Sequence, residues 1–145
     1  MKIEEIQELW EKDSEINPLR MEEESLKISK LHSKYYGIYI KESIRLEQMS
    51  TNLKDFYKER WKFYNKMQPK EAYDERFDDS FFDKKLLKED RKIFIDADEE
   101  LTKEQMKVHI QSEKVKFLDS IIKTISNRNF TIKNYIDYMK YANGF

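Results

Sequence analysis

Apolar residues recur at helical spacing along most of this chain. Over the first dozen residues, Ile3, Ile6, Leu9 and Trp10 fall on one face, which predicts a short amphipathic helix ending near Asp13. The following pair, residues 17–18, is Asn-Pro, which is typical of a helix start. Asn accepts hydrogen bonds from unpaired backbone amides, and Pro at the first helical position has no N–H to leave unpaired. We therefore expect a long helix to begin there.

A heptad-like seam runs through this expected helix. No Pro follows until Pro69, so about 50 residues can form one helix. Because a single helix cannot bury such a seam against itself, we expect partner helices and an oligomer. Its polar members either set register or lie at the seam edge. The members, in steps of three and four, are Ile28, His32, Tyr35, Tyr39, Glu42, Leu46, Met49, Leu53, Phe56, Arg60, Phe63 and Met67.

The middle of the chain carries weaker signals. Residues 68–82 combine a Pro with acids and aromatics without clear periodicity, which predicts a connecting loop. Residues 83–95 show a weak helical pattern, although the apolar run 93–95 also suits a short strand. An acidic connector, residues 96–100, follows.

A second long helix is predicted where Thr102 to Gln105 fits a capping box. Residues 127–129 interrupt it, Thr131 is suited to cap a last helix, and Gly144 ends that helix. The apolar face of the second helix is wider than a monomer of this size easily covers, which favours oligomerisation. The candidate oligomerisation residues are Ile110, Phe117, Leu118, Ile121, Ile122 and Ile125.

Composition supports an all-α fold of long amphipathic helices. The 145 residues include only two Gly and two Pro, so a sheet-rich fold with many turns is nearly excluded. Charged residues make up 39%, yet 14% aromatics are too many for a disordered polyelectrolyte. There is no Cys, no apolar run long enough to span a membrane and no secretory signal. We expect a soluble intracellular protein.

The net charge of −1 hides strongly charged blocks. Residues 1–24 carry −6, residues 25–70 carry +7, residues 71–105 carry −6 and residues 106–145 carry +4. Because salt screening limits the electrostatic reach of each block to about 10 Å, a polyanion responds to the basic block more than to the net charge of the chain. The simpler alternative is a solvated helix face with a chance excess of Lys.

Catalytic motifs are missing. The sequence has no phosphate-binding loop, no nucleophile elbow and no zinc-protease motif, so we expect no enzyme activity. Two His and no Cys make a metal site improbable, and we expect no metal and no cofactor. The acid pairs Asp78-Asp79 and Asp96/Asp98 are interpreted as solvated loop residues. His32 and His109 are assigned no role.

Cations and aromatics interleave over residues 54–66. Single-strand nucleic-acid sites use this combination, because cations follow the phosphates while flat side chains stack on bases. The alternative is a helix whose Phe56 and Phe63, with Tyr64 as a further candidate, are seam residues and whose Lys residues solvate the far face. Both can hold on one helix. We assign the two Phe to the core. The candidate DNA-binding residues are Lys54, Tyr57, Lys58, Arg60, Trp61, Lys62, Tyr64 and Lys66.

The chain resembles the UvsY recombination mediators of T-even-like bacteriophages over nearly its whole length. The likeness rests on KIEEIQE near the start, Ser33-Lys34-Tyr35, YKERWKFY at 57–64 and ISNRNFTIKNYIDYMKYANG at 125–144. The family segment at 57–64 reads approximately LKARLDYY. Lys58 and Arg60 match its basic positions and Tyr64 its last aromatic, whereas Glu59 and Trp61 depart from it.

This resemblance implies a non-enzymatic mediator that assembles as a helical ring or barrel, commonly a hexamer or heptamer. It would bind single-stranded DNA and load a RecA-like phage recombinase onto strands coated by the phage single-strand-binding protein. The setting would be phage recombination, repair and recombination-dependent replication in the cytoplasm of the infected bacterium, with no membrane involved. The competing hypothesis is a coiled-coil structural or adaptor protein without DNA affinity.

The resemblance and the charge pattern together predict three regions. Residues 1–67 would be a helical region with the DNA motif, residues 68–101 an acidic connector with a short helix, and residues 102–145 the oligomerisation region. The acidic blocks would either meet basic faces of protein partners or compete with DNA.

Overall fold

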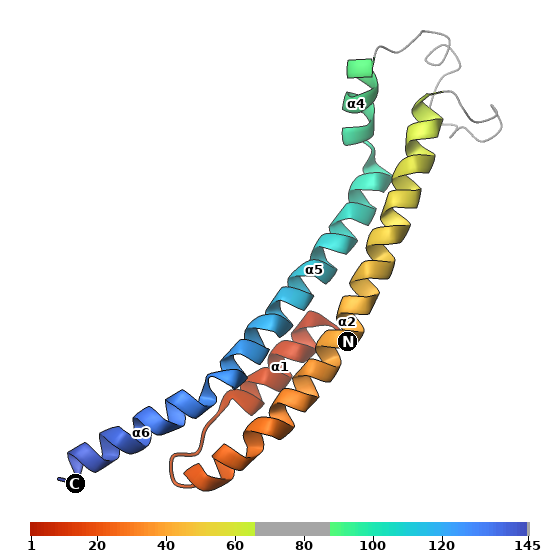
Figure 1. Cartoon of the computed structure of the whole chain (residues 1–145). Helices are drawn as coiled ribbons and strands as arrows, with labels where there is room; N and C mark the ends of the chain where they lie inside the picture. Colours follow the sequence, from red (N-terminus) through yellow and green to blue (C-terminus); the bar gives the residue numbers. More distant parts are fainter. Residues whose placement is uncertain (66–87, 145) are drawn as a thin grey trace. The chain divides into compact units, whose positions relative to one another are not determined.

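The computed structural model describes residues 1–65 and 88–144, and these form helices without any strand (Figure 1). This confirms the all-α prediction for the described part of the chain. The loop predicted at 68–82 lies outside it. No helix in the described ranges is long and apolar enough to cross a membrane. The helices are α1 (Ile3–Ser14), α2 (Met21–Tyr64), α4 (Lys88–Asp96), α5 (Glu99–Ser126) and α6 (Arg128–Ala142).

Helix α1 confirms the first predicted helix, but α2 begins later than Asn17-Pro18 indicated. The Asn17 side-chain oxygen accepts a hydrogen bond from the Leu19 amide at 3.0 Å, and its carbonyl oxygen accepts one from the Arg20 amide at 3.1 Å. Asn17 therefore closes a turn on its own backbone rather than capping the helix. The helical ladder starts with the Glu24 amide donating to the Arg20 carbonyl.

The predicted start of the second long helix at Thr102 is wrong. Helix α5 begins at Glu99, because Asp98 acts as its cap and accepts a hydrogen bond from the Leu101 amide at 2.8 Å. Thr102 lies inside the helix, where its hydroxyl donates to the Asp98 carbonyl. The run 93–95 belongs to helix α4 and not to a strand.

The last helix begins earlier than Thr131 indicated. Helix α6 starts at Arg128 after the cap residue Asn127, whose side chain makes no capping hydrogen bond. The predicted end at Gly144 is confirmed. Gly144 has a φ of +76°, a conformation that favours glycine, and its amide donates to the Tyr141 carbonyl.

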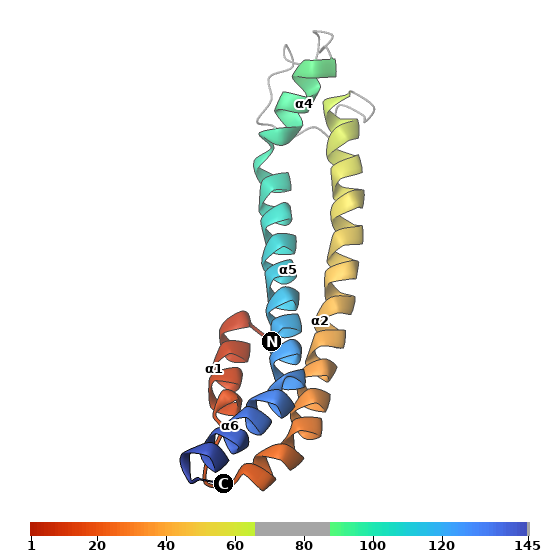
Figure 2. The same cartoon turned by 60° about the vertical axis from the view of Figure 1, so that its left-hand side comes forward.

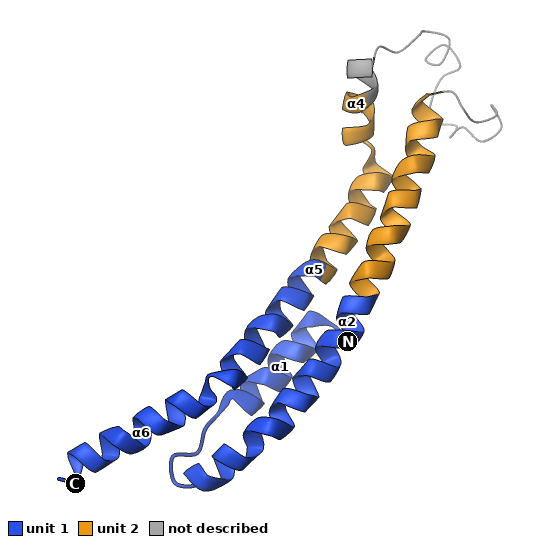
Figure 3. Cartoon of the chain, viewed as in Figure 1, with its two compact units in different colours: residues 1–44, 112–145 blue, residues 45–111 orange. Residues whose placement is uncertain are grey.

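The chain divides into two compact units, and α2 and α5 contribute to both (Figure 3). Unit 1 comprises residues 1–44 and 112–145, and unit 2 comprises residues 45–111. The three regions predicted from the sequence were defined by function, and their bounds differ from those of the two compact units. They stay a prediction.

The core of unit 1 joins three helices, with α1 lying beside parts of α2 and α5 (Figure 2). The ring of Trp10 on α1 meets Tyr35 of α2 edge-on, at 5.3 Å between centroids. Seam residues Ile28, Tyr35 and Tyr39 all contribute to this core, as predicted, whereas His32 is exposed. The fully buried members are Ile6, Tyr35, Leu118, Ile121 and Ile125.

Unit 2 has its own smaller core, in which α2 meets α4 and α5. Its buried residues are Phe63, Tyr64, Ile95 and Leu101, with Leu53, Phe56 and Phe94 packed against them. Phe56 and Phe63 were assigned to the core from the sequence, and this is confirmed. In both units, helices of the same chain cover the described seam residues that are buried.

Candidate nucleic-acid interface

An exposed row of three lysines follows the last turns of α2 in unit 2. Lys54, Lys58 and Lys62 are spaced by four residues, so they lie on one side of the helix. None of the three forms an ion pair with a described residue. Asp55 and Glu59 are also exposed and form a separate row on the same helix. The lysine row is thus available to a polyanion, with two acids beside it.

Two large aromatic side chains stand beside these lysines. Tyr57 is 42% exposed and Trp61 is 36% exposed, and their spacing of four residues places them on one side of α2. This side flanks the face that carries Leu53, Phe56 and Phe63 into the core of unit 2, and the lysine row lies farther round the helix from that core. Flat aromatic faces next to unpaired cations are the elements of a single-strand binding surface.

Arg60 and Tyr64 lie elsewhere, although the sequence grouped them with the same surface. The Arg60 side chain is only 13% exposed, and its Nε donates to Asp98 Oδ2 at 2.7 Å. The Tyr64 hydroxyl donates to the same oxygen at 2.8 Å. The Arg60 guanidinium also lies 4.8 Å from the centre of the Phe63 ring. Lys66, the last candidate, lies outside the described residues.

The charges in this cluster stabilise one another. Burial by itself raises the pKa of Asp98, but hydrogen bonds from the Leu101 amide, Tyr64 and Arg60 outweigh burial and hold the pKa below its ordinary value. Burial and the Asp98 carboxylate together raise the pKa of Tyr64. Asp98 is therefore ionised and Tyr64 protonated at neutral pH, and the Arg60 charge is neutralised inside unit 2.

Asp98 is the residue that sequence reasoning missed. It was interpreted as part of a solvated acidic connector, whereas it is 4% exposed and joins α2 to the start of α5. A usable signal was present, since Asp followed by two Glu is typical of a helix N-terminus. Within the described residues, no group of three or more His, Asp or Glu is arranged to hold a metal ion.

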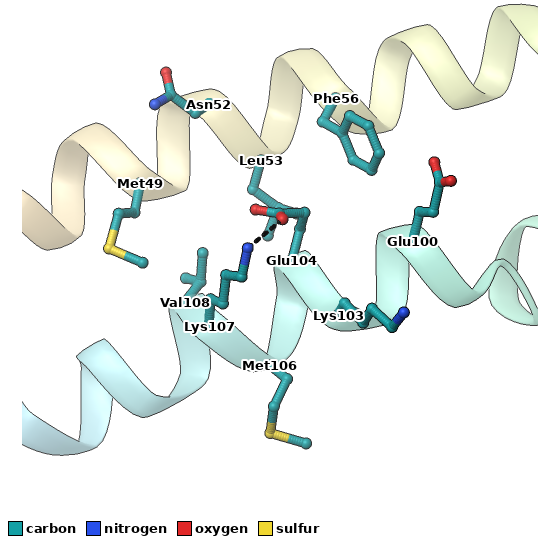
Figure 4. A pocket seen from close by; sticks show the side chains of 10 residues that line it. All are labelled: Met49, Asn52, Leu53, Phe56, Glu100, Lys103, Glu104, Met106, Lys107 and Val108. Carbon is teal, nitrogen blue, oxygen red and sulfur yellow. Dashed lines mark hydrogen bonds and ion pairs between the residues drawn. The ribbon is translucent and has the colours of Figure 1, made fainter.

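A groove of about 740 Å³ lies between α2 and α5 in unit 2 (Figure 4). Leu53 and Phe56 point into it from α2, while Met106 on α5 points away from α2. A Lys107–Glu104 ion pair of 2.8 Å lies on its α5 side. Because the groove faces α5, it is separate from the outward-facing lysine row.

The candidate oligomerisation residues are divided between core and surface. Leu118, Ile121 and Ile125 are buried in the core of unit 1, and Phe117 and Ile122 pack against it. Ile110, in unit 2, is 51% exposed. The breadth of the α5 apolar face is thus largely accounted for by α1 and α2 of the same chain. Other exposed apolar side chains gather on α6, and the largest are Phe130, Ile136, Tyr138, Met139 and Tyr141.

Comparison with known proteins agrees with this architecture. Residues 9–145 match the family model described as "Recombination, repair and ssDNA binding protein UvsY". The fold is similar to a crystal structure of the bacteriophage T4 recombination mediator protein UvsY, with a TM-score of 0.78 at 20% identity. That match covers 98% of this chain and 99% of the T4 chain. A search of curated protein sequences found no match.

The family model covers nearly the whole chain and defines its class, an all-helical protein of DNA recombination and repair. The chain belongs to the UvsY family.

Proposed function

We propose that this protein is a recombination mediator that binds single-stranded DNA through the exposed surface of α2 in unit 2. The observation that carries the proposal is a row of exposed lysines, with no ion pair to any residue that the structure describes, beside two exposed aromatics in a chain of the UvsY family. Lys54, Lys58 and Lys62 would contact phosphates, and Tyr57 and Trp61 would stack on bases. No step in this function requires bond chemistry, a metal or a cofactor.

Arg60 and Tyr64 would support this surface from the buried side of α2. Their hydrogen bonds to Asp98 fix the last turns of α2 against the start of α5. Such fixing presents the lysines and aromatics in one orientation, which lowers the entropy lost when DNA binds. Lys66 continues the same four-residue spacing and would extend the phosphate contacts.

The proposed mediator loads a RecA-like phage recombinase onto strands coated by the phage single-strand-binding protein, in the infected bacterial cell. Several copies would present several α2 surfaces, so that one strand gains affinity from many weak contacts. This supports extraction of DNA from the coat protein without a tight individual site. In unit 1 the exposed apolar side chains of α6 would meet a second copy, and in unit 2 the exposed Ile110 would make a separate contact.

The first experiment is a titration of fluorescein-labelled oligo-dT, followed by anisotropy at several salt concentrations. We expect binding that weakens steeply with salt, because each phosphate contact contributes a slope of about −0.7. Lys58→Ala with Lys62→Ala should weaken binding and flatten the slope by about 0.7 for each lysine. Lys116→Ala, which removes an exposed lysine of α5 paired with Glu113, is the matched control and should leave the slope unchanged.

Two outcomes would contradict the proposal. Absence of binding at low salt would favour the structural or adaptor protein. Equal slopes for the double variant and the control would remove the α2 lysines from the interface. Loading is tested separately, by measuring the recombinase's DNA-dependent ATPase on coated strands with and without this protein. If this protein does not shorten the delay before the ATPase reaches its full rate, the mediator role is rejected.

A further inference from the structure

A second exposed surface runs along α2 within unit 1, on the side of the helix opposite the core. Its members follow one another in steps of four and three residues, so they lie on one side of the helix. Ile28 and Tyr35, which belong to the core of unit 1, lie on the other side. We call this surface the α2 stripe, and its members are Leu26, Lys30, Ser33, Gly37, Ile40 and Ile44.

The described part of the chain leaves the α2 stripe largely uncovered. Leu26 is 81% exposed, Ile40 is 42% exposed and Ile44 is 55% exposed. Gly37, in the middle, would meet nothing within 4 Å if it carried a Cβ. A glycine inside a helix costs stability, and no described neighbour comes close enough to require one. The stripe therefore offers apolar side chains around a low point at which the axis of another helix can approach closely.

Exposed lysines accompany these apolar side chains. Lys30 belongs to the stripe and Lys41 lies at its edge, and neither forms an ion pair with a described residue. Over residues 25–44, α2 carries four lysines and a single acid, Glu42. That acid is buried and paired with Lys114 at 3.3 Å, so it does not offset the surface charge. The charge beside the apolar side chains is therefore positive.

A cavity of about 280 Å³ in unit 1 adds to this charge, and Lys30 lines it together with residues of α1 and the start of α6. Its lining includes five cations and three acids, so it is positive overall. Of these cations, Lys12 and Lys30 form no ion pair with a described residue. Both remain available to a carboxylate that enters the cavity.

These features suit a protein segment better than a nucleic-acid strand. Ile40 and Ile44 can bury apolar area, but they offer no flat face on which a base could stack. Tyr36, whose ring is exposed, lies on a different side of α2 from Lys30 and Lys41. The lysines thus stand beside aliphatic side chains and not beside aromatic rings, which favours a ligand that combines carboxylates with apolar side chains.

We propose that the α2 stripe is a docking site for an acidic amphipathic helix of another protein. Apolar side chains of that helix pack on Ile40, Ile44 and the low point at Gly37, and its carboxylates pair with Lys30 and Lys41. The stripe is about 27 Å long, which matches a partner helix of about 18 residues. Apolar packing supplies most of the affinity, and the charge pairs set the orientation of the helix. The site uses none of the DNA contacts proposed for unit 2, so it goes beyond the proposed function.

The test uses a fluorescein-labelled peptide of about 18 residues, with Leu at helical spacing and Glu at the other positions. A second peptide carries Gln in place of every Glu. We expect the Glu peptide to bind and the Gln peptide to bind about fivefold more weakly or less, because Gln cannot pair with the lysines. Equal binding of the two peptides would overturn the inference.

Two double variants locate the site, and all four positions are exposed, so both should keep the helical circular dichroism of wild type. Lys30→Ala with Lys41→Ala should weaken binding of the Glu peptide about fivefold and leave oligo-dT binding unchanged. Ile40→Ser with Ile44→Ser should weaken peptide binding about tenfold or more, because the apolar contact is lost. Wild-type peptide affinity in either variant would overturn the inference.

The matched control is Lys58→Ala with Lys62→Ala, which removes the same charge from the DNA surface of unit 2. It should bind the Glu peptide as wild type does and bind oligo-dT weakly, the reverse of Lys30→Ala with Lys41→Ala. If the latter variant loses oligo-dT binding instead, the stripe is a DNA surface and the inference is wrong. If wild type binds the Glu peptide but no DNA, the proposed function fails and the docking site stands.

A second copy of the chain is the other possible occupant of the stripe. In that case wild type binds neither peptide, and Ile40→Ser with Ile44→Ser gives smaller particles on size-exclusion chromatography. This pair of results would overturn the docking of a partner helix and leave the proposed DNA surface untouched.

Discussion

A basic residue in a DNA-binding motif can contact phosphate only if its charge is not already neutralised within the fold. Lys58 and Arg60 are two residues apart and match the same family motif, but they differ in this respect. Lys58 is exposed and unpaired among the described residues, whereas Arg60 is held by Asp98. Loss of DNA binding in an Arg60 variant would therefore have a different physical cause from the same loss in a Lys58 variant.

Arg60→Ala should lower the free energy of unfolding by about 3 kcal/mol, because it leaves the buried Asp98 carboxylate without its cation. Lys58→Ala should change the free energy of unfolding by less than about 0.5 kcal/mol, as is usual at exposed sites. Urea unfolding followed by far-ultraviolet circular dichroism measures both. Equal stability of the two variants would show that the Arg60–Asp98 pair contributes nothing net to the fold.

The same cluster predicts a pH dependence. The folded pKa of Asp98 lies below its ordinary value of 3.8, so folding is favoured by the ionised form. This stabilisation is fully present above the ordinary pKa and is lost as the pH falls through the folded pKa. Asp98→Asn should unfold more easily at pH 7 and show a shallower loss of stability on acidification. Parallel acid curves for the variant and wild type would contradict this assignment.

At the scale of the elements, the sequence predicted periodic faces better than helix ends. A face is specified by many residues, so the seam of α2 points inward even though His32 is an exception. A helix start depends on one side chain among several competitors. Asn17 closes a turn on its own backbone instead of capping α2, and α6 begins before Thr131. Asp98 caps α5, because Arg60 and Tyr64 also hold its carboxylate in place.

Periodicity also could not tell which helix covers a face. The α5 residues Leu118, Ile121 and Ile125 are as apolar as any subunit interface, but α1 and α2 of the same chain bury them. Likewise, two cations close in sequence, Lys58 and Arg60, look equally available until Asp98, distant in sequence, neutralises Arg60. Such long-range pairing carries no local signal.

A buried arginine, Arg128, ties the start of helix α6 to the rest of unit 1. Arg128 is 3% exposed, lies 3.8 Å from the Glu24 carboxylate, and donates to the Asp13 carbonyl. Its guanidinium also lies 5.7 Å from the centre of the Trp10 ring. The three contacts link the start of α6 to α1 and α2.

Arg128→Met should destabilise unit 1 by about 3 kcal/mol, because Glu24 remains buried and loses its buried partner. In this variant, amide hydrogen exchange should become faster throughout α6 than in wild type. The core of α5 should change less, since α6 buries fewer apolar side chains of its own. Lys133→Met, at an exposed position of α6, is the matched control. Unchanged protection of α6 in the Arg128 variant would mean that Ile132 alone docks the helix.

At the scale of the whole molecule, the two cores place different surfaces in different units. Unit 2 carries the lysine row and the groove, whereas unit 1 carries the exposed apolar residues of α6. Variants in α6 therefore do not touch the proposed DNA contacts of unit 2. Self-association and single-site DNA binding should be separable by substitution, which is a condition for attributing affinity to multivalency.

Tyr138→Ser with Tyr141→Ser should give smaller particles on size-exclusion chromatography with light scattering, because both side chains are exposed and apolar in the single chain. If avidity supplies the affinity, this variant should bind long oligo-dT much more weakly than wild type, by about a hundredfold or more. Binding to an oligonucleotide short enough for one α2 surface should stay unchanged, because that site is intact. Equal losses on short and long strands would mean that the α6 substitutions disturb the fold. Full retention of long-strand affinity by a dissociated chain would show that a single copy holds the DNA without help from its neighbours.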